Sequence, residues 1–261
     1  MLHRRARPAG GPGPYPEAKK AGIFRRRAAW LASELQTYQI VKEAVFYDLD
    51  NTLVSAETEK VFAVHLLSRG VATRRDLLRI AWFRLQYWLR LYKSFEEAKR
   101  KLVKVLLAGK EAERCFALYR EIFEGTLQLL VRPGFREIVE EHRKRGRLQF
   151  IVSSNSDFIA RSFCELLGLD GFLASRLEIA GGLFTGNVLG PIYAGNGKAE
   201  AARLLAREHD LDLSASHAYG DYFEDRHILG AVGHPIAVHP DRKLRKLARQ
   251  NGWPILEASG S

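Results

Sequence analysis

The sequence has few cysteines, no long apolar runs and fewer acidic than basic residues. Its 261 residues include two cysteines, Cys115 and Cys164, with no CxxC spacing. That argues against a disulfide framework or a zinc knuckle and fits a reducing compartment. No run reaches the roughly 18 apolar residues of a membrane span, and no apolar stretch with a cleavage site follows the N-terminal arginines. We therefore expect a cytoplasmic protein.

The deficit of acidic residues leaves a formal net charge of +11, from 41 Lys and Arg against 30 Asp and Glu. Such a charge favours an anionic partner: nucleic acid, a membrane surface or a phosphorylated substrate. Residues 1–43 hold nine Lys or Arg and three Glu, a net +6, so the rest of the chain carries only +5. We therefore expect no specific nucleic-acid partner. Weak contact of the basic extension with an anionic membrane stays open.

The two ends of the chain differ in composition from the middle. Residues 1–43 form a basic extension, and the Gly/Pro cluster from Pro8 to Pro16 favours partial disorder over an organelle transit peptide. Within it, Phe24 to Ile40 has the pattern of a short basic amphipathic helix. Residues 257–261 are expected to form a short C-terminal tail.

Between these ends, short apolar runs alternate with helical patterns. Ala44–Tyr47 is an apolar run that stops at Asp48, as a buried parallel strand would. Further strands are expected at Leu148–Val152, Ser216–Gly220 and Pro235–Val238, helices at Gly134–Arg145, Asp157–Leu167, Lys198–His209, Phe223–Ala231 and Arg242–Gln250, and a hairpin at Arg176–Leu189. This alternation predicts an α/β fold with a doubly wound, Rossmann-like parallel sheet, built from residues 44–56 and 131–256.

Residues 57–130 interrupt this core with an insertion that has helical patterns almost throughout. It is too long for a simple crossover, so we expect a helical cap over the carboxyl edge of the sheet. Within it, Leu77–Tyr92 is rich in Leu and aromatic residues and is punctuated by Arg79, Arg84 and Arg90. We favour a buried cap helix with extended arginines. A helix that lies on a membrane surface is the alternative.

Polar side chains follow the ends of several predicted strands. The run Asp48–Thr52 (DLDNT) follows the first strand, and Ser153–Asn155 follows the second. Asp221 and Asp225 follow a later strand, and Lys198 opens a helix. Because the carboxyl ends of parallel strands meet at one edge, we expect these groups to converge. Clustered carboxylates repel each other and need a cation, and Mg²⁺ prefers oxygen ligands.

In this order, DxDxT, a serine, a lysine and GDxxxD resemble the haloacid dehalogenase superfamily, specifically its phosphoserine-phosphatase-like branch. The resemblance covers residues 44 to 256 and includes Leu183–Gly186 and Asn251–Pro254. It implies a magnesium-dependent phosphatase that hydrolyses phosphate monoesters through a phospho-aspartate.

The resemblance also implies roles for individual residues. Asp48 is the expected nucleophile and Asp50 the general acid and base. Ser153 and Lys198 are expected to hold the transferring phosphoryl group. The Mg²⁺ ligands would be the carboxylates of Asp48 and Asp221 and the backbone carbonyl of Asp50. Asp225 would support the metal site from behind its ligands, and Thr52 would orient the loop.

The expected substrate is a small phosphorylated metabolite, with O-phosphoserine the leading candidate. In phosphoserine phosphatases, the positions of Glu57 and Arg100 recognise the amino and carboxylate groups. Arg100 could equally lie on a solvated helix face beside glutamates. Ser154 and Asn155, which we also assign to substrate binding, replace the family's usual two glycines, and Glu224 replaces its usual asparagine.

These departures keep other functions open. One alternative is a broad-specificity, sugar-phosphate or lipid-phosphate phosphatase of the same family. Another is a non-catalytic phospho-acceptor module, which is disfavoured because such modules are shorter and lack both the insertion and an equivalent of Asp50. The sequence does not indicate an oligomeric state.

Overall fold

The computed structural model describes residues 42–257 except residues 72 and 90. The strands are β1 (Ala44–Tyr47), β2 (Leu148–Ser156), β3 (Gly171–Ala180), β4 (Leu183–Leu189), β5 (His217–Gly220), β6 (His234–Val238) and β7 (Ile255–Leu256). The helices are α2 (Thr58–Ser68), α3 (Arg74–Trp88), α4 (Phe95–Leu107), α5 (Ala112–Gly125), α6 (Phe135–Lys144), α7 (Asp157–Leu167), α8 (Asn196–His209), α9 (Arg226–Leu229) and α10 (Arg242–Asn251), with short 3-10 helices η1 (Leu127–Leu130) and η2 (Phe223–Asp225).

Within the described residues, the strands form one seven-stranded sheet in the order β4-β3-β2-β1-β5-β6-β7. All neighbouring strands are parallel except β3 and β4, which form an antiparallel hairpin. The central strand β1 has no exposed side chain, which explains its uninterrupted apolar sequence. The predicted doubly wound α/β fold is confirmed.

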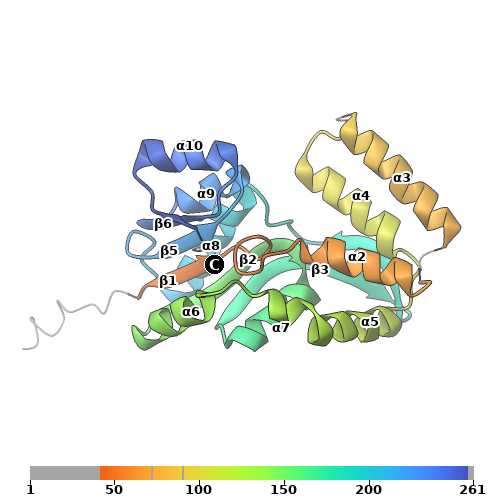
Figure 1. Ribbon diagram of the computed structural model, residues 1–261, viewed down its shortest axis with the longest axis horizontal. Helices are drawn as coiled ribbons and strands as arrows, with labels where there is room; N and C mark the ends of the chain where they lie inside the picture. The colour runs from red at the N-terminus through yellow and green to blue at the C-terminus, as the bar shows by residue number, and fades with distance from the viewer. Residues whose placement is uncertain (1–41, 72, 90, 258–261) are drawn as a thin grey trace, which may run out of the picture. The chain divides into compact units, whose positions relative to one another are not determined.

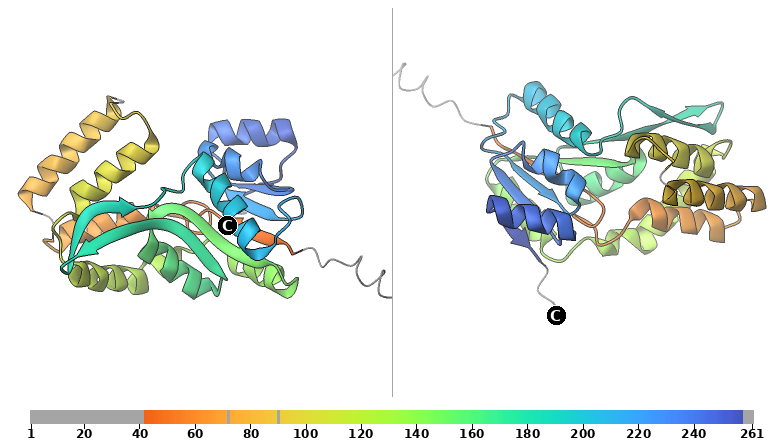
Figure 2. Two further views of the ribbon diagram at one scale, coloured as in Figure 1. Left: turned by 180° about the vertical axis from the view of Figure 1, so that it is seen from behind. Right: turned by 90° about the horizontal axis from the view of Figure 1, so that it is seen from above.

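The sheet has a hydrophobic core on each face, as the alternation of side chains along β1 requires. Val45 and Tyr47 belong to a cluster that includes buried residues of α6 and α7. Ala44 and Phe46 belong to a second cluster, with buried residues of α8, α9 and α10. Figures 1 and 2 show these two groups of helices on opposite faces of the sheet.

The insertion between β1 and β2 contains α2, α3, α4, α5 and η1. It rests partly on the β3–β4 hairpin, because backbone hydrogen bonds join Gly109 N to the Phe184 oxygen (2.8 Å) and Phe184 N to the Lys110 oxygen (2.9 Å). At Gly186 a Cβ atom would lie 2.8 Å from Cβ of Ala108, so the hairpin approaches α4 too closely for any side chain. The helical insertion therefore packs against the β3–β4 hairpin at one edge of the sheet.

Some predictions fall outside the described residues. These include the helix at Phe24–Ile40, all but the last two residues of the 1–43 extension, and residues 258–261 of the expected tail. The core and cap boundaries stay predictions. Among the described helices, none combines the length and apolarity that crossing a bilayer would require.

Candidate active site

The loop after β1 places the DxDxT motif at the carboxyl edge of the sheet, beginning with Asp48. Asp48 is buried, and its backbone N donates to the Tyr219 oxygen of β5 at 3.0 Å. Asn51 adopts a left-handed conformation (φ 56°), which turns the chain back. Thr52 Oγ1 then donates to Asp48 Oδ2 (3.4 Å) and Asp221 Oδ1 (3.2 Å). The hydroxyl of Thr52 thus links the two strand ends.

Lys198, in the first turn of α8, lies between two carboxylates. Its Nζ donates to Asp48 Oδ1 at 2.6 Å and to Asp225 Oδ1 at 2.5 Å. Asp225 Oδ2 accepts from the backbone N of Asp221 (3.1 Å) and of Tyr222 (3.0 Å). Asp48, Lys198 and Asp225, which are distant in sequence, are therefore in direct contact.

The approach of Asp225 to Lys198 requires a glycine at the end of β5. A Cβ atom at Gly220 would lie 2.7 Å from Cβ of Asp225, closer than real Cβ contacts. The glycine of the GDxxxD motif therefore provides the space in which Asp225 folds back towards Lys198. Its role is steric, because no positive φ is involved.

The electrostatics of this cluster favour a bound cation. Burial, followed by the charges of Asp48 and Asp225, raises the pKa of Asp221 to about 8. Burial also raises the pKa of Asp48, although the charge of Lys198 acts in the opposite direction. For Lys198, burial alone would lower the pKa, but Asp225 and Asp48 outweigh it and the net shift is upward. The lysine thus stays charged, and one ammonium does not compensate the surrounding carboxylates.

The ligand atoms present fit a hard divalent cation. Carboxylate oxygens of Asp48, Asp221 and Asp225 all lie within 4.8 Å of one another. Oxygen donors without sulfur or imidazole suit Mg²⁺, which takes few protein ligands and leaves room for phosphate.

The Asp50 carboxylate bonds to the start of α2. Its Oδ1 accepts hydrogen bonds from Thr58 N (3.1 Å) and Thr58 Oγ1 (2.7 Å), and Thr58 Oγ1 accepts from Asn155 Nδ2 at 2.9 Å. Burial raises the pKa of Asp50 to about 6, although the bonds from Thr58 lower it. A carboxyl with this pKa can exchange a proton near neutral pH. Our sequence analysis missed Thr58, whose only signal is its position at the start of a helix.

The end of β2 supplies Ser153, the serine expected to hold the phosphoryl group. The register between β2 and β3 shifts between Val152 and Ser156, so Ser153–Asn155 leave the regular ladder at the carboxyl edge. Ser153 is buried, and its Oγ accepts from Asn155 N at 3.2 Å. Ser154 is half-buried, and its carbonyl accepts from Ser175 Oγ at 2.8 Å. Asn155 thus faces the cap helix, whereas the Ser154 backbone faces β3.

Two charged side chains from the cap join this edge and were not anticipated from the sequence. Glu59 Oε1 accepts from Ser156 N and from Ser156 Oγ, both at 2.8 Å. Its other carboxylate oxygen pairs with Nζ of Lys99, which is buried in α4. Glu59 is also one of the charges that raise the pKa of Asp50. Glu59 of the cap therefore acts on the Asp50 carboxyl, and Lys99 pairs with Glu59.

The two residues predicted to recognise the substrate lie elsewhere. The Glu57 side chain is 60% exposed and lies 3.6 Å from Lys60 Nζ on the outside of α2. The Arg100 guanidinium donates to the carbonyls of Val188 (2.6 Å) and Gly190 (2.7 Å) and to Glu96. Both side chains are engaged in these contacts, and their role in substrate recognition stays a prediction.

Arg132 is a further residue that the sequence analysis missed. Its guanidinium donates to the backbone oxygen of Asn51 through Nε (3.1 Å) and Nη2 (2.9 Å). Burial lowers its pKa, whereas the charge of Asp221 acts to raise it. Arg132 thus holds the left-handed turn of the loop after β1 and adds positive charge near Asp221.

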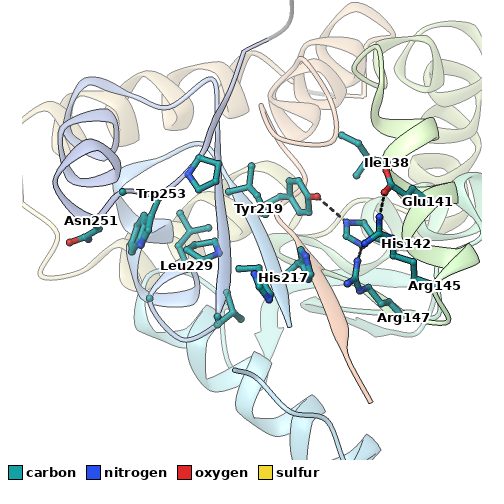
Figure 3. A pocket seen from close by; sticks show the side chains of 18 residues that line it. Ile138, Glu141, His142, Arg145, Arg147, His217, Tyr219, Leu229, Asn251 and Trp253 are labelled. Atoms are coloured by element: carbon teal, nitrogen blue, oxygen red, sulfur yellow. Dashed lines mark hydrogen bonds and ion pairs between the residues drawn. The ribbon is translucent and has the colours of Figure 1, made fainter. Parts of the chain in front are cut away.

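The opposite edge of the sheet contains a separate cavity of about 830 Å³. It is lined by residues at the amino ends of strands, including His234 of β6 and His217 of β5 (Figure 3). His142 bonds the Tyr219 hydroxyl (2.9 Å) through Nε2 and Arg147 Nη1 (3.0 Å) through Nδ1. Because parallel strands separate their two ends, this cavity is distinct from the acidic cluster.

Comparison with known proteins agrees with this geometry. The family model for haloacid dehalogenase-like hydrolases matches residues 45–230. The chain is 31% identical to phosphoserine phosphatase SerB1 of Mycobacterium tuberculosis over 96% of this chain and 82% of that protein. It is 26% identical to a histidinol-phosphatase of Neisseria meningitidis over 83% of this chain and 99% of that protein. A solved structure of substrate-bound phosphoserine phosphatase has a TM-score of 0.60 at 25% identity, covering 78% of this chain and 90% of that one. The chain therefore belongs to the haloacid dehalogenase-like hydrolases, as its ordered motifs predicted, and resembles the phosphoserine phosphatases among them.

Proposed function

We propose that the protein is a Mg²⁺-dependent phosphomonoester hydrolase that works through a phospho-aspartate on Asp48. The observation that carries this proposal is the position of Asp48. Its carboxylate lies at a strand end, 2.6 Å from Lys198 Nζ and within 4.8 Å of carboxylate oxygens of Asp221 and Asp225. Such a site can hold both an anionic phosphoryl group and a cation beside a carboxylate nucleophile.

The carboxylates of Asp48 and Asp221 and the backbone carbonyl of Asp50 would hold the metal, with Asp225 supporting the site from behind. When bound, Mg²⁺ supplies positive charge to the oxygens of the phosphoryl group. The ammonium of Lys198 and the hydroxyl of Ser153 would contact the same oxygens.

In the first step, a carboxylate oxygen of Asp48 attacks phosphorus and the ester P–O bond breaks. The carboxyl of Asp50 gives its proton to the departing alkoxide, which leaves as an alcohol. In the second step, Asp50 takes a proton from water as the water oxygen attacks phosphorus. The bond between phosphorus and Asp48 then breaks, releasing inorganic phosphate. A pKa of about 6 for Asp50 suits both roles.

A phospho-acceptor module without turnover is the less favoured function. The position of Asp50 argues against it, because a carboxyl held by Thr58 beside the nucleophile provides a proton donor for turnover. Our leading substrate is O-phosphoserine, and a broader range of phosphate esters is the alternative. In place of Glu57 and Arg100, we propose that Glu59 and Lys99 recognise the amino and carboxylate groups, because the charge of Glu59 acts on Asp50 and Lys99 pairs with Glu59.

The mechanism is tested by phosphate release from a panel of esters with and without added Mg²⁺. We expect Asp48→Asn to lower turnover by at least about 10³-fold, because an amide is not a nucleophile. Asp210→Asn, the same change at an exposed residue, serves as the control. Full activity of Asp48→Asn, or turnover of wild type after chelation of all divalent ions, would contradict the proposal.

Substrate recognition needs a separate comparison of two adjacent residues. We expect Lys99→Met to raise KM for phosphoserine about tenfold or more while changing KM little for phosphoethanolamine, which lacks the carboxylate. Arg100→Met should not discriminate between the two esters, because its guanidinium bonds to backbone carbonyls. If Lys99→Met affects both esters equally, a broad-specificity enzyme is the better description.

A further inference from the structure

The outer face of α3 exposes apolar side chains to an unusual extent. Leu78, Trp82, Leu85 and Leu89 follow the spacing i, i+4, i+7 and i+11, so they share one helical stripe. Trp88 and Leu78 are 77% and 72% exposed, and Trp82 is 59% exposed. Leu77 is also exposed, as are Leu91 and Phe95 around the connection to α4. We call Leu77, Leu78, Trp82, Leu85, Trp88 and Leu89 the α3 outer face.

The opposite side of α3 holds the helix in the cap. Asp76 and Phe83 are buried there. Asp76 pairs with Lys110 Nζ at 3.0 Å, and the Phe83 ring lies 5.4 Å from that of Tyr92. In Figure 1, α3 is the outer helix of the α3–α4 pair. Our preference for a buried cap helix is therefore wrong for the α3 outer face, which is not needed to fill the cap.

Basic residues flank the α3 outer face. Arg75 and Arg79 lie on one side of the stripe and Arg84 on the other, and all three are exposed. The nearby acids are already engaged: Asp76 with Lys110 and, at 3.7 Å, with Arg79, Glu96 with Arg100, and Glu97 with the backbone N of Lys93. A hollow next to the stripe is lined by Arg84, Trp88, Lys93 and Phe95 among others. The surface is thus apolar in the centre and cationic at its border.

We infer that the α3 outer face docks on an anionic phospholipid surface, with α3 lying in the plane of the interface. Leu and Trp would enter the boundary between headgroups and acyl chains, and the arginines would reach lipid phosphates. A stripe of Trp and Leu bordered by Arg is typical of helices that lie at a membrane interface. At 15 residues, α3 is too short to span a bilayer.

Charge argues for lipid rather than a second copy of this chain. In a symmetric dimer through this face, the arginines of one copy would meet those of the other, and such like-charge contacts are costly. An anionic bilayer instead offers phosphates to every arginine and an apolar interior to every leucine. This inference does not depend on the proposed catalytic function.

The test is flotation of the full chain with phosphatidylglycerol-containing vesicles, with pure phosphatidylcholine vesicles in parallel. We expect co-flotation with the anionic vesicles that weakens as salt rises. Leu78→Ser with Trp82→Ser and Trp88→Ser should lower the partition coefficient at least about tenfold. Changing Arg75, Arg79 and Arg84 to Gln should lower it by about fivefold per residue. Trp82→Phe with Trp88→Phe should retain binding and lose the quenching of tryptophan emission by brominated lipid.

Circular dichroism and thermal unfolding should be unchanged in these variants, because the altered side chains are exposed. Absence of wild-type binding to anionic vesicles would overturn the inference. Undiminished binding of the serine variant would overturn it too, since another part of the chain would then bind lipid. A wild-type dimer that the serine changes dissociate, without any vesicle binding, would assign the face to a second copy of the chain.

Discussion

Strands β1 and β5 have ionisable clusters near both of their ends, with carboxylates at the carboxyl ends and imidazoles at the amino ends. At the carboxyl ends, Asp48 and Asp221 lie together, and burial raises the pKa of Asp221 to about 8. At the amino ends, burial, followed by Arg147, lowers the pKa of His142 to about 4 and that of His217 to about 3. Burial opposes charge in both places. The two ends differ in how the cost of burial is met. At the carboxyl ends a bound cation can stabilise the ionised carboxylates, whereas at the amino ends the imidazoles stay neutral.

Tyr219 connects the two ends. Its backbone oxygen accepts from Asp48 N, while its hydroxyl bonds His142. The ends could therefore be coupled through this residue, or they could be independent parts with different tasks. We expect independence, with catalysis at the carboxyl ends and stability at the amino ends.

The largest effect is expected from Lys198→Met at the carboxyl ends. Removing the ammonium leaves Asp48 and Asp225 without their buried partner, which should lower the free energy of unfolding by about 3 kcal/mol. Turnover should fall on the order of 10³-fold. Urea denaturation and phosphate release measure the two effects. Lys110→Met, which also breaks a buried pair, should lower stability but leave turnover within a few fold; equal turnover in both variants would contradict the assignment.

Gly220→Ala should have the next largest effect. The added methyl group would overlap Asp225, so we expect about 2 kcal/mol of destabilisation. Displacement of Asp225 should also shift Lys198 and lower turnover by roughly 10- to 100-fold. Gly125→Ala in α5 meets no neighbouring atom, so it should leave turnover unchanged and should not lower stability. Wild-type turnover in Gly220→Ala would show that the position of Asp225 is unimportant.

Tyr219→Phe tests whether the two ends are coupled. The variant loses one buried hydrogen bond to His142, so the free energy of unfolding should fall by about 1 kcal/mol. Turnover should stay within about twofold, since the backbone bond to Asp48 remains. Tyr47→Phe, which loses a bond to Gln149, should behave in the same way. A large loss of turnover in Tyr219→Phe alone would mean that the ends act together.

The smallest effect concerns pH at the amino ends. In the unfolded chain His142 takes up a proton as pH falls through 6.5, but in the folded protein only near pH 4. Its contribution to stability is therefore present above pH 6.5 and is lost as pH falls towards 4. The difference in Tm between wild type and His142→Gln should shrink over this window. The other titrating groups are common to both proteins, so a constant difference would contradict the low pKa.

Much of the fold could be predicted because its signals are local. Apolar runs such as Ala44–Tyr47 identify buried strands, and polar residues directly after them identify the functional edge. The order of Asp48, Ser153, Lys198 and Asp221 along the chain was sufficient to name the family. These signals need no knowledge of how distant helices pack.

The cap could not be predicted in the same way. Glu59 and Lys99 form an ion pair that joins α2 to α4, and no sequence spacing encodes this pair. Likewise, Arg100 bonds to the carbonyl of Val188 in β4 and to that of Gly190 just after it, and the sequence does not show these contacts. The exposure of α3 was misjudged because one apolar stripe can face either a core or a lipid surface.

The hairpin that supports α4 has a further consequence for engineering. Arg100 is attached to the carbonyls of Val188 and Gly190, and the chain leads from there directly into the first turn of α8. Cap helices taken from a relative would lose these hydrogen bonds unless the hairpin of the same relative were transferred with them. For chimeric enzymes, the exchangeable unit is therefore discontinuous: residues 57–130 together with 171–190.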